Sequence, residues 1–222
     1  MNYHLRGKTA LLTSATAGVG LAAAHLLAQE GATVYLHGRT LAAVEQAGER
    51  VRAAVPRAAL RPVVADLLEA TSVLTLLAAV PRVDILVDSL GLDEPGSATE
   101  PGGVRLARHY FPLMLAQNWG RIIYVAKDNN QPAPAIRQPL TTQAVNHCLL
   151  ALLAAGSRVT VNAVLLHSSV GAVPALAGQP ERGSTPEEVA HLLAYVASPL
   201  AAASSGEAWH VATEAATLVR HP

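Results

Sequence analysis

Cysteine, lysine and aromatic residues are all scarce in this chain. Cys148 is the single cysteine among 222 residues, so an internal disulfide is excluded. Charged residues make up only 14% of the sequence, and the 16 basic residues balance the 16 acidic ones. This balance gives no attraction to polyanions, so we expect neither nucleic acid nor a membrane surface as a partner. No apolar run is long enough for a transmembrane helix, and we expect a cytoplasmic protein.

Hydrophobic residues, by contrast, are abundant. They make up 51% of the chain, and the mean hydropathy is +0.30. The length suits one α/β domain with a well-buried core, which we place over residues 1–222. An interior that is large relative to the polar surface favours apolar contact faces between subunits. We therefore expect a homodimer or a homotetramer.

Short apolar runs alternate with longer segments of helical periodicity, which is typical of βαβ units on a parallel sheet. We predict strands at residues 9–13, 33–36, 60–64, 85–87, 122–125, 159–164 and 208–211. We predict helices near residues 18–30, 41–54, 68–80, 104–117, 141–155 and 186–197. The last helix has a clear start, because Thr185 can cap it, Pro186 suits its first position and Glu188 completes a capping box. The predicted fold class is α/β, with a doubly wound parallel sheet of about seven strands and helices on both faces.

The first predicted strand leads into a helix through the turn TSATAGVG, residues 13–20. Gly18 and Gly20, on either side of Val19, let the backbone approach a phosphate, whose charge would meet unpaired N–H groups at the helix start. Ser14 and Thr16 add hydroxyl donors. We predict a nucleotide-binding turn, with plain strand-to-helix packing as the alternative.

Two further polar residues follow the second and third predicted strands. Arg39 suits a 2′-phosphate, whereas an acidic residue at this position would pair with a ribose 2′-hydroxyl. Asp66, which precedes Leu67, can accept a hydrogen bond from an adenine amine. The alternatives are a solvated arginine and a helix N-cap.

Together these segments resemble the short-chain dehydrogenase/reductase family, whose domain has a Rossmann-like fold. The first turn resembles the family's TGxxxGxG with Ser14 in place of the first glycine, and HGRT resembles the NADP-type end of the second strand. LVDSLG resembles the NNAG strand, and through it the resemblance adds Leu90 and Gly91 to the cofactor-binding residues. Further similar stretches are residues 103–123, 160–165 and 185–211. The resemblance covers nearly the whole chain and implies NADP(H) as cofactor.

The family's catalytic residues are missing from their expected positions. The resemblance implies an Asn-Ser-Tyr-Lys set, in which the tyrosine exchanges a proton with the substrate oxygen. Counted from the GRII strand, the serine falls on Lys127, the tyrosine on Leu140 and the lysine on Ala144. The asparagine falls on Thr99, in a segment that is shortened around residues 92–103. We expect a divergent member without ordinary redox catalysis.

The two halves of the cofactor site are therefore expected to behave differently. The adenosine-phosphate half keeps its polar residues, whereas the nicotinamide half has lost its lysine, and the family's Pro-Gly after the sixth strand is Leu166 and His167. Tyr110 and Tyr124 are poor substitutes for the missing acid, since one is expected on a helix and the other within a strand. NADP(H) is thus expected to bind without reacting.

Lys127, Asp128 and His167 are the remaining candidates for catalysis. We expect Lys127 and Asp128 in the loop after the fifth strand, where the lysine can act as a base, a nucleophile or a carboxylate ligand. His167 is a second titratable group at a strand end. The alternatives are an ammonium in solvent beside Asp128 and a structural histidine. We expect no metal site, because the nine histidines are scattered.

Cys148 is expected to pack in the apolar face of a helix. The helices at 104–117 and 141–155 form the dimer interface in the resembling family, which also allows a hetero-oligomer with an active relative. Three functional hypotheses follow. The chain is a non-redox enzyme or pseudoenzyme of small-molecule, secondary-metabolite-like metabolism, a non-catalytic partner of an active relative, or an NADP(H)-dependent oxidoreductase with a substitute proton donor.

Overall fold

The structure is a computed structural model that describes residues 2–89, 102–128, 150, 153–167, 185–211 and 216–219. The side chains of residues 127, 128, 167, 210 and 216–219 lie outside this description. The described strands form one sheet in the order β3-β2-β1-β4-β5-β6-β7-β8, in which only β7 and β8 pair antiparallel. The strands are β1 (Thr9–Leu12), β2 (Thr33–Gly38), β3 (Ala59–Val64), β4 (Ile85–Asp88), β5 (Gly120–Asp128), β6 (Val159–His167), β7 (Ala208–Val211) and β8 (Ala216–Val219).

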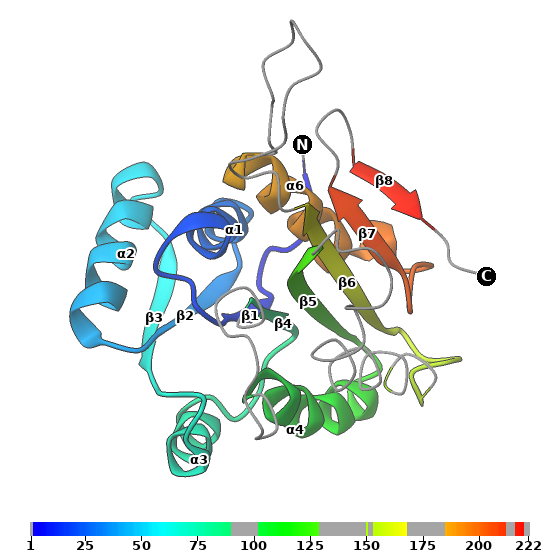
Figure 1. Cartoon of the computed structure of the whole chain (residues 1–222), viewed down its shortest axis with the longest axis horizontal. Helices are drawn as coiled ribbons and strands as arrows, with labels where there is room; N and C mark the ends of the chain where they lie inside the picture. Colours follow the sequence, from blue (N-terminus) through cyan, green and yellow to red (C-terminus); the bar gives the residue numbers. More distant parts are fainter. Residues whose placement is uncertain are drawn as a thin grey trace, which may run out of the picture.

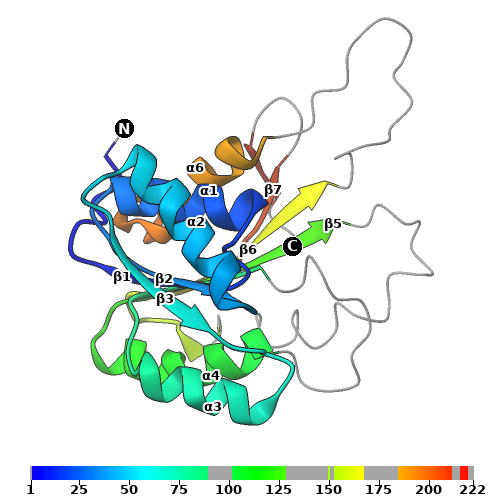
Figure 2. The ribbon, with the colours of Figure 1, turned by 90° about the vertical axis from the view of Figure 1, so that its left-hand side faces the viewer.

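Helices cover both faces of this sheet. They are α1 (Gly18–Gln29), α2 (Leu41–Ala54), α3 (Ala70–Ala79), α4 (Gly102–Ala116) and α6 (Pro186–Ala197), followed by the short 3-10 turn η2 (Pro199–Ala201). Helices α1, α2 and α6 lie on one face, and α3 and α4 lie on the other (Figures 1 and 2). The predicted start of α6 is confirmed, because the side chains and backbones of Thr185 and Glu188 bond each other in a capping box.

The sheet separates two hydrophobic cores. Successive side chains of a strand point to opposite faces, so β5 contributes to both cores. Ile123 and Val125 pack toward α1 and α6, whereas Ile122 and Tyr124 pack toward α3 and α4. A strand buried on both faces has an unbroken apolar sequence, which is why the central strands were predictable without an alternating pattern.

The predicted fold class is confirmed, with one addition. All seven predicted strands are present, and the sheet gains the antiparallel strand β8. Five of the six predicted helices are present within one or two residues of their expected ends. The sixth, at 141–155, lies almost wholly outside the described residues. None of the helices in the described part of the chain combines the length and hydropathy of a membrane span.

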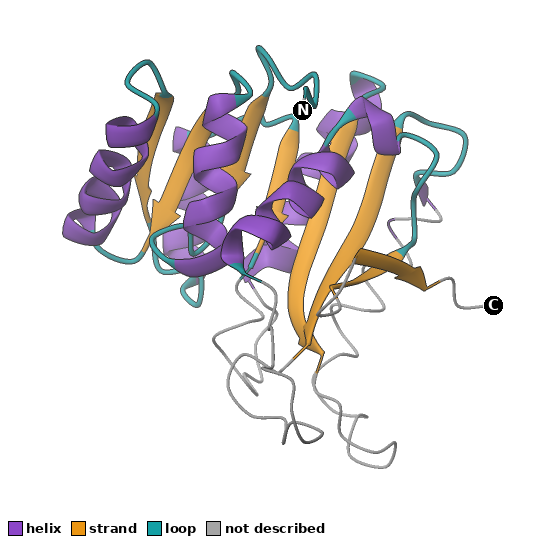
Figure 3. Ribbon diagram, turned by 90° about the horizontal axis from the view of Figure 1, so that it is seen from above, coloured by secondary structure: helices purple, strands orange, loops and turns teal. Residues whose placement is uncertain are grey.

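The strand order reverses between β1 and β4, which lie side by side at the centre of the sheet. Chain connections leave these two strands in opposite directions, so a crevice opens beyond their carboxyl ends. The carboxyl ends of the parallel strands all lie at the same edge of the sheet (Figure 3). This edge is where a ligand site is expected.

Candidate functional site

A pocket of about 330 Å³ lies at this reversal point. It is lined by the turn between β1 and α1, the end of β2, the connection between β3 and α3, and the residue after β4. The lining residues are Ser14, Thr16, Ala17, Gly18, Val19, Gly20, His37, Gly38, Arg39, Asp66, Leu67, Leu68 and Ser89. Eight residues predicted to bind a cofactor are therefore brought together. The other two, Leu90 and Gly91, lie outside the described residues.

The glycine-rich turn brings the start of α1 close to the pocket. A Cβ on Gly20 would come within 2.7 Å of the Ser14 carbonyl oxygen, so only glycine allows this close packing of turn and helix. Gly18 has a φ of +52°, in the left-handed region. Ala17, at the N-cap, has no side-chain oxygen to accept from the first N–H groups of the helix. These N–H groups are suited to an anion.

Ser14 adopts a left-handed conformation, with a φ of +50°. The family that the sequence resembles has glycine at this position. A residue with a side chain there pays about 1–2 kcal/mol in conformational free energy. The Ser14 N–H donates to Nδ1 of His37 at 3.2 Å, and the Ala15 N–H donates to the His37 carbonyl at 2.9 Å. The turn is therefore held by β2.

His37 was missed by the sequence analysis as a site residue. Its side chain is 1% exposed, and its second ring nitrogen, Nε2, lies 3.0 Å from the Ala65 carbonyl oxygen. Burial lowers the pKa of His37 and outweighs the opposing effects of the Ala65 carbonyl and Asp66. The signal in the sequence was a polar side chain at the buried end of an otherwise apolar strand, TVYLHG.

Asp66 is half-buried at the side of the pocket. One of its carboxylate oxygens accepts from the Leu68 N–H at 3.0 Å, which stabilises the turn before α3. Helix α3 begins at Ala70, with Glu69 at its N-cap. The alternative that Asp66 caps this helix is therefore wrong. Arg39 is exposed at the rim of the pocket, as both the 2′-phosphate prediction and the solvated alternative allow.

A hydrogen-bonded group of three residues lies beneath the pocket. The Thr13 hydroxyl donates to Oδ1 of Asp88 at 2.8 Å and accepts from the Ser89 N–H at 2.9 Å. The Ser89 hydroxyl donates to the Thr13 carbonyl. A Cβ on Gly103 would overlap the Asp88 carboxylate, so α4 begins directly against this group. The base of the pocket is thus fixed by β1, β4 and α4 together.

The three predicted catalytic residues end two neighbouring strands. Lys127 and Asp128 belong to β5, so their predicted placement in a loop is wrong. Strand β5 continues because it pairs with β6 to its end, with Lys127 opposite Leu166 and Asp128 opposite His167. The side chains of Lys127, Asp128 and His167 lie outside the described part of the structure, and their catalytic roles stay predictions.

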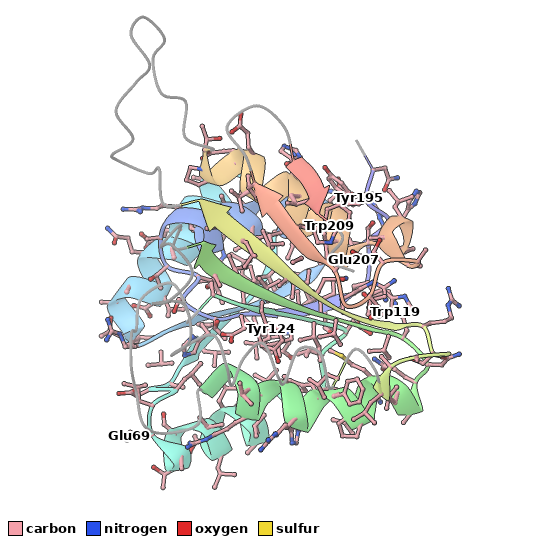
Figure 4. The ribbon with its side chains drawn as sticks, turned by 45° about the vertical axis from the view of Figure 1, so that its right-hand side comes forward. Glu69, Trp119, Tyr124, Tyr195, Glu207 and Trp209 are labelled. Atoms are coloured by element: carbon pink, nitrogen blue, oxygen red, sulfur yellow. The ribbon has the colours of Figure 1, made fainter. Side chains whose placement is uncertain are left out.

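Tyr110 and Tyr124 are both buried on the α4 side of the sheet. The Tyr110 hydroxyl donates to the Val80 carbonyl at 2.7 Å, and burial raises its pKa. Tyr124 lies on β5 (Figure 4). Its partner in the pairing with β4 is Asp88. Neither tyrosine is among the pocket-lining residues. In the described part of the chain, no three His, Cys, Asp or Glu side chains gather as metal ligands would.

Comparisons with known proteins agree with this architecture. The family model for short chain dehydrogenases matches residues 8–137. The uncharacterized oxidoreductase YvaG of Bacillus subtilis (strain 168) is 31% identical over 252 aligned positions, which cover 94% of this chain and 96% of YvaG. This alignment is longer than the chain itself, so YvaG has segments without a counterpart here.

Two solved structures have the same fold. One, from Beutenbergia cavernae with NADP bound at low occupancy, is provisionally named an NAD(P)-dependent gluconate 5-dehydrogenase. It has a TM-score of 0.74 and 27% identity, with 95% of this chain and 97% of that chain covered. A variant of actinorhodin polyketide ketoreductase with NADPH has a TM-score of 0.76 and 24% identity, with 96% and 98% covered, and shows the fold alone. From the family model and YvaG it follows that this chain belongs to the short-chain dehydrogenase family.

Proposed function

We propose that this chain binds NADP(H) through the adenosine half of the cofactor and does not carry out the ordinary hydride transfer of its family. One observation carries the proposal. The pocket gathers eight residues suited to the adenosine and phosphate groups, whereas the positions of the family's serine, tyrosine and lysine hold Lys127, Leu140 and Ala144.

The fit of the adenosine half rests on described geometry. Gly20 packs closely against Ser14, and the start of α1 is exposed at Ala17 and Gly18, where its N–H groups suit a phosphate. Arg39 at the rim supplies a cation for a 2′-phosphate. Asp66, with one oxygen used in its own turn, lies where an adenine amine can donate. A similar protein was solved with NADP bound, which is consistent with this proposal.

The proposed loss of hydride transfer rests on missing proton chemistry. When bound and active, a nicotinamide supplies hydride, and the enzyme must then supply or remove a proton. Leu140 has no proton to give at the expected position. Tyr110 cannot replace it, because its hydroxyl is bonded to Val80 and its raised pKa opposes ionisation. Tyr124 is buried within β5.

One further observation favours a non-redox enzyme over a pseudoenzyme. Strand pairing places Lys127 and Asp128 beside Leu166 and His167, at the same edge of the sheet as the pocket. The register pairs Asp128 with His167 and sets Lys127 one residue before Asp128, and titratable residues at these strand ends suit acid–base chemistry on a small carbonyl compound. A Lys127→Ala variant with unchanged turnover of such a compound would count against this version.

A thermal-shift titration tests the proposal. The ligands are NADP, NADPH, adenosine 2′,5′-bisphosphate and nicotinamide mononucleotide. A ligand at one hundred times its Kd stabilises the native state by about 2.7 kcal/mol, or roughly 5–10 °C for a domain of this size. We expect this shift from the first three ligands and none from nicotinamide mononucleotide. Stabilisation by nicotinamide mononucleotide, or turnover of NADPH at 340 nm with carbonyl substrates, would contradict the proposal.

A further inference from the structure

His37 connects three elements that line the pocket. It lies at the end of β2, and its backbone carbonyl accepts from Ala15 in the glycine-rich turn. Its ring bonds the Ser14 N–H on one side and the Ala65 carbonyl on the other. The next residue, Gly38, accepts through its carbonyl from the Ala65 N–H at 3.2 Å. The turn and the end of β3 are therefore held at fixed positions by one side chain and its neighbouring backbone.

The two partners of the ring determine its protonation state. A backbone N–H can only donate, so Nδ1, which lies 3.2 Å from the Ser14 nitrogen, must present a lone pair. A carbonyl can only accept, so Nε2 must carry the hydrogen. Only the neutral tautomer with hydrogen on Nε2 satisfies both bonds. A second proton on Nδ1 would face the Ser14 N–H, donor against donor.

The bond to Ser14 matters because the turn is strained there. Ser14 has a φ of +50° in a position that suits glycine, and its conformation depends on the bonds around it. Loss of the Nδ1 acceptor would leave the Ser14 N–H without its partner inside a part-buried site. The turn would then relax, and with it the N–H groups at the start of α1.

We infer that His37 is a positioning residue for the pocket, whose neutral ring holds the glycine-rich turn in the form that binds the adenosine half, and whose protonation releases it. The inference rests on the proposed function for its consequence, which is weaker dinucleotide binding at acid pH. The structural part of the inference concerns the free protein and is independent of the proposed function.

The charged surroundings of His37 set the direction of the effect. The turn at residues 13–20 contributes no titratable side chain, and α2 packs Val44 beside Gly38. Asp66, from the β3 side, favours the protonated ring, but burial outweighs it and lowers the pKa from 6.5. Arg39, two residues along the chain, is exposed. The ring is therefore neutral at pH 7, and the hold on the turn is lost as the pH falls below 6.5 through the lowered pKa.

Nitrogen NMR on the free wild-type protein tests the structural part. We expect His37 Nε2 to be protonated and Nδ1 unprotonated at pH 7.5, with the Ser14 amide signal moving in step with the titration of the ring. A hydrogen on Nδ1 at pH 7.5, or a Ser14 signal that ignores the titration, would overturn the inference whatever the protein binds.

Affinity measurements test the consequence, with Kd for NADP and for NAD measured at pH 8.0 and 5.5. The matched variants are His37→Asn, which keeps an acceptor near Nδ1 and does not titrate, and His37→Gln, which reaches toward Ala65 instead. Between pH 8.0 and pH 5.5, we expect the affinity of the wild type to fall by a factor about ten times larger than the factor for His37→Asn. His37→Gln should bind more weakly than His37→Asn at both pH values.

The comparison separates the possible failures. The 2′-phosphate of NADP also titrates near pH 6, but this contribution is shared by wild type and variant and is missing from NAD. Equal pH profiles for wild type and His37→Asn would overturn the inference while leaving dinucleotide binding intact. Absence of binding at both pH values would overturn the proposed function and the coupling of His37 to it. The NMR titration would still show whether the His37 ring holds the turn in the free protein.

Discussion

At the scale of single residues, we propose that Arg39 decides between the two forms of the cofactor. An Arg39→Ala variant should lose about tenfold in affinity for NADP and almost nothing for NAD, because the guanidinium acts on the 2′-phosphate alone. The effect stays modest because Arg39 is exposed and water screens its charge. Isothermal titration at fixed ionic strength measures both affinities. Arg39→Lys, which keeps the charge without the paired donors, should lie between.

Equal losses for NADP and NAD would show that Arg39 supports the pocket rather than the phosphate. An unchanged affinity for NADP would make it the solvated arginine of the alternative hypothesis. Either outcome leaves the glycine-rich turn as the proposed binding element, because Arg39 contributes no bond to that turn among the described contacts.

Ser14 poses a second question at this scale, because its backbone conformation is unfavourable for any residue with a Cβ. Ser14→Gly should raise the free energy of unfolding by up to about 1 kcal/mol, as relief of the left-handed strain exceeds the added freedom of the unfolded chain. The same change removes a hydroxyl from the pocket and should weaken binding of adenosine 2′,5′-bisphosphate.

Ser14→Ala is the matched control for this prediction. It removes the hydroxyl and keeps the strain, so it should weaken binding without raising stability. Denaturant unfolding measures the stability of each variant, and ligand titration measures its affinity for adenosine 2′,5′-bisphosphate. If Ser14→Gly and Ser14→Ala were equally stable, the strain assigned to this turn would be wrong.

At the scale of elements, the contact between α4 and β4 fixes the base of the pocket. Gly103→Ala places a methyl group where the Asp88 carboxylate lies, so either α4 or this buried carboxylate must shift. We expect a loss of about 2 kcal/mol or more in the free energy of unfolding. Gly48→Ala in α2 is a matched helix control. Its methyl group meets only the flexible end of Arg52, so it should be neutral or stabilising by up to about 1 kcal/mol.

A double variant identifies the source of the cost. In an Asp88→Ala background the carboxylate is gone, and Gly103→Ala should then cost much less than in the wild type. Urea unfolding of the four proteins gives the coupling directly. A cost for Gly103→Ala that is the same in both backgrounds would assign the effect to the helix backbone and not to the contact with Asp88.

The elements themselves were largely predictable, and the reason is periodicity. Strands such as β1 and β4 are short apolar runs between helical segments, and the capping box at Thr185 marks a helix start without help from the rest of the fold. The ends of β5 and β6 were not predictable, because Lys127 and His167 extend the strands through pairing between chain segments far apart in the sequence. Strand β8 was missed for the same reason.

The residues of the pocket were predictable only in part. Residues such as Gly20 and Asp66 belong to local patterns next to strand ends, so the sequence alone points to them. His37 opens the HGRT segment and is a polar residue at the buried end of its strand, but this local pattern does not show what its ring binds. Its importance comes from Ser14 and Ala65, which approach it only when β1, β2 and β3 lie side by side. Contacts between separate strand ends are beyond any local reading of the sequence.

At the scale of the whole molecule, the apolar composition favours the proposal of contacts beyond one chain. Hydrophobic residues make up 51% of the sequence, and large apolar side chains remain exposed, among them Leu74, at 66% exposure, and Leu153, at 58%. Isolated exposed leucines are ordinary, but a chain with so few charges has little polar surface to keep it soluble alone. We propose a homodimer or a homotetramer as the assembled form.

Light scattering after size-exclusion chromatography measures the mass of the assembled form directly, and we expect two or four times 23.0 kDa. The mass should not change between 0.1 and 1 M salt, since apolar contacts are not weakened by screening, whereas contacts between charged groups are.

Leu153→Asp adds a charge to one exposed apolar position and should lower the mass if the segment around it is part of the contact. Leu74→Asp on α3 is the control, because α3 lies outside the helices expected at the interface. A mass of one chain at micromolar concentration would contradict the proposed assembly, and a lower mass for Leu74→Asp alone would move the contact to α3.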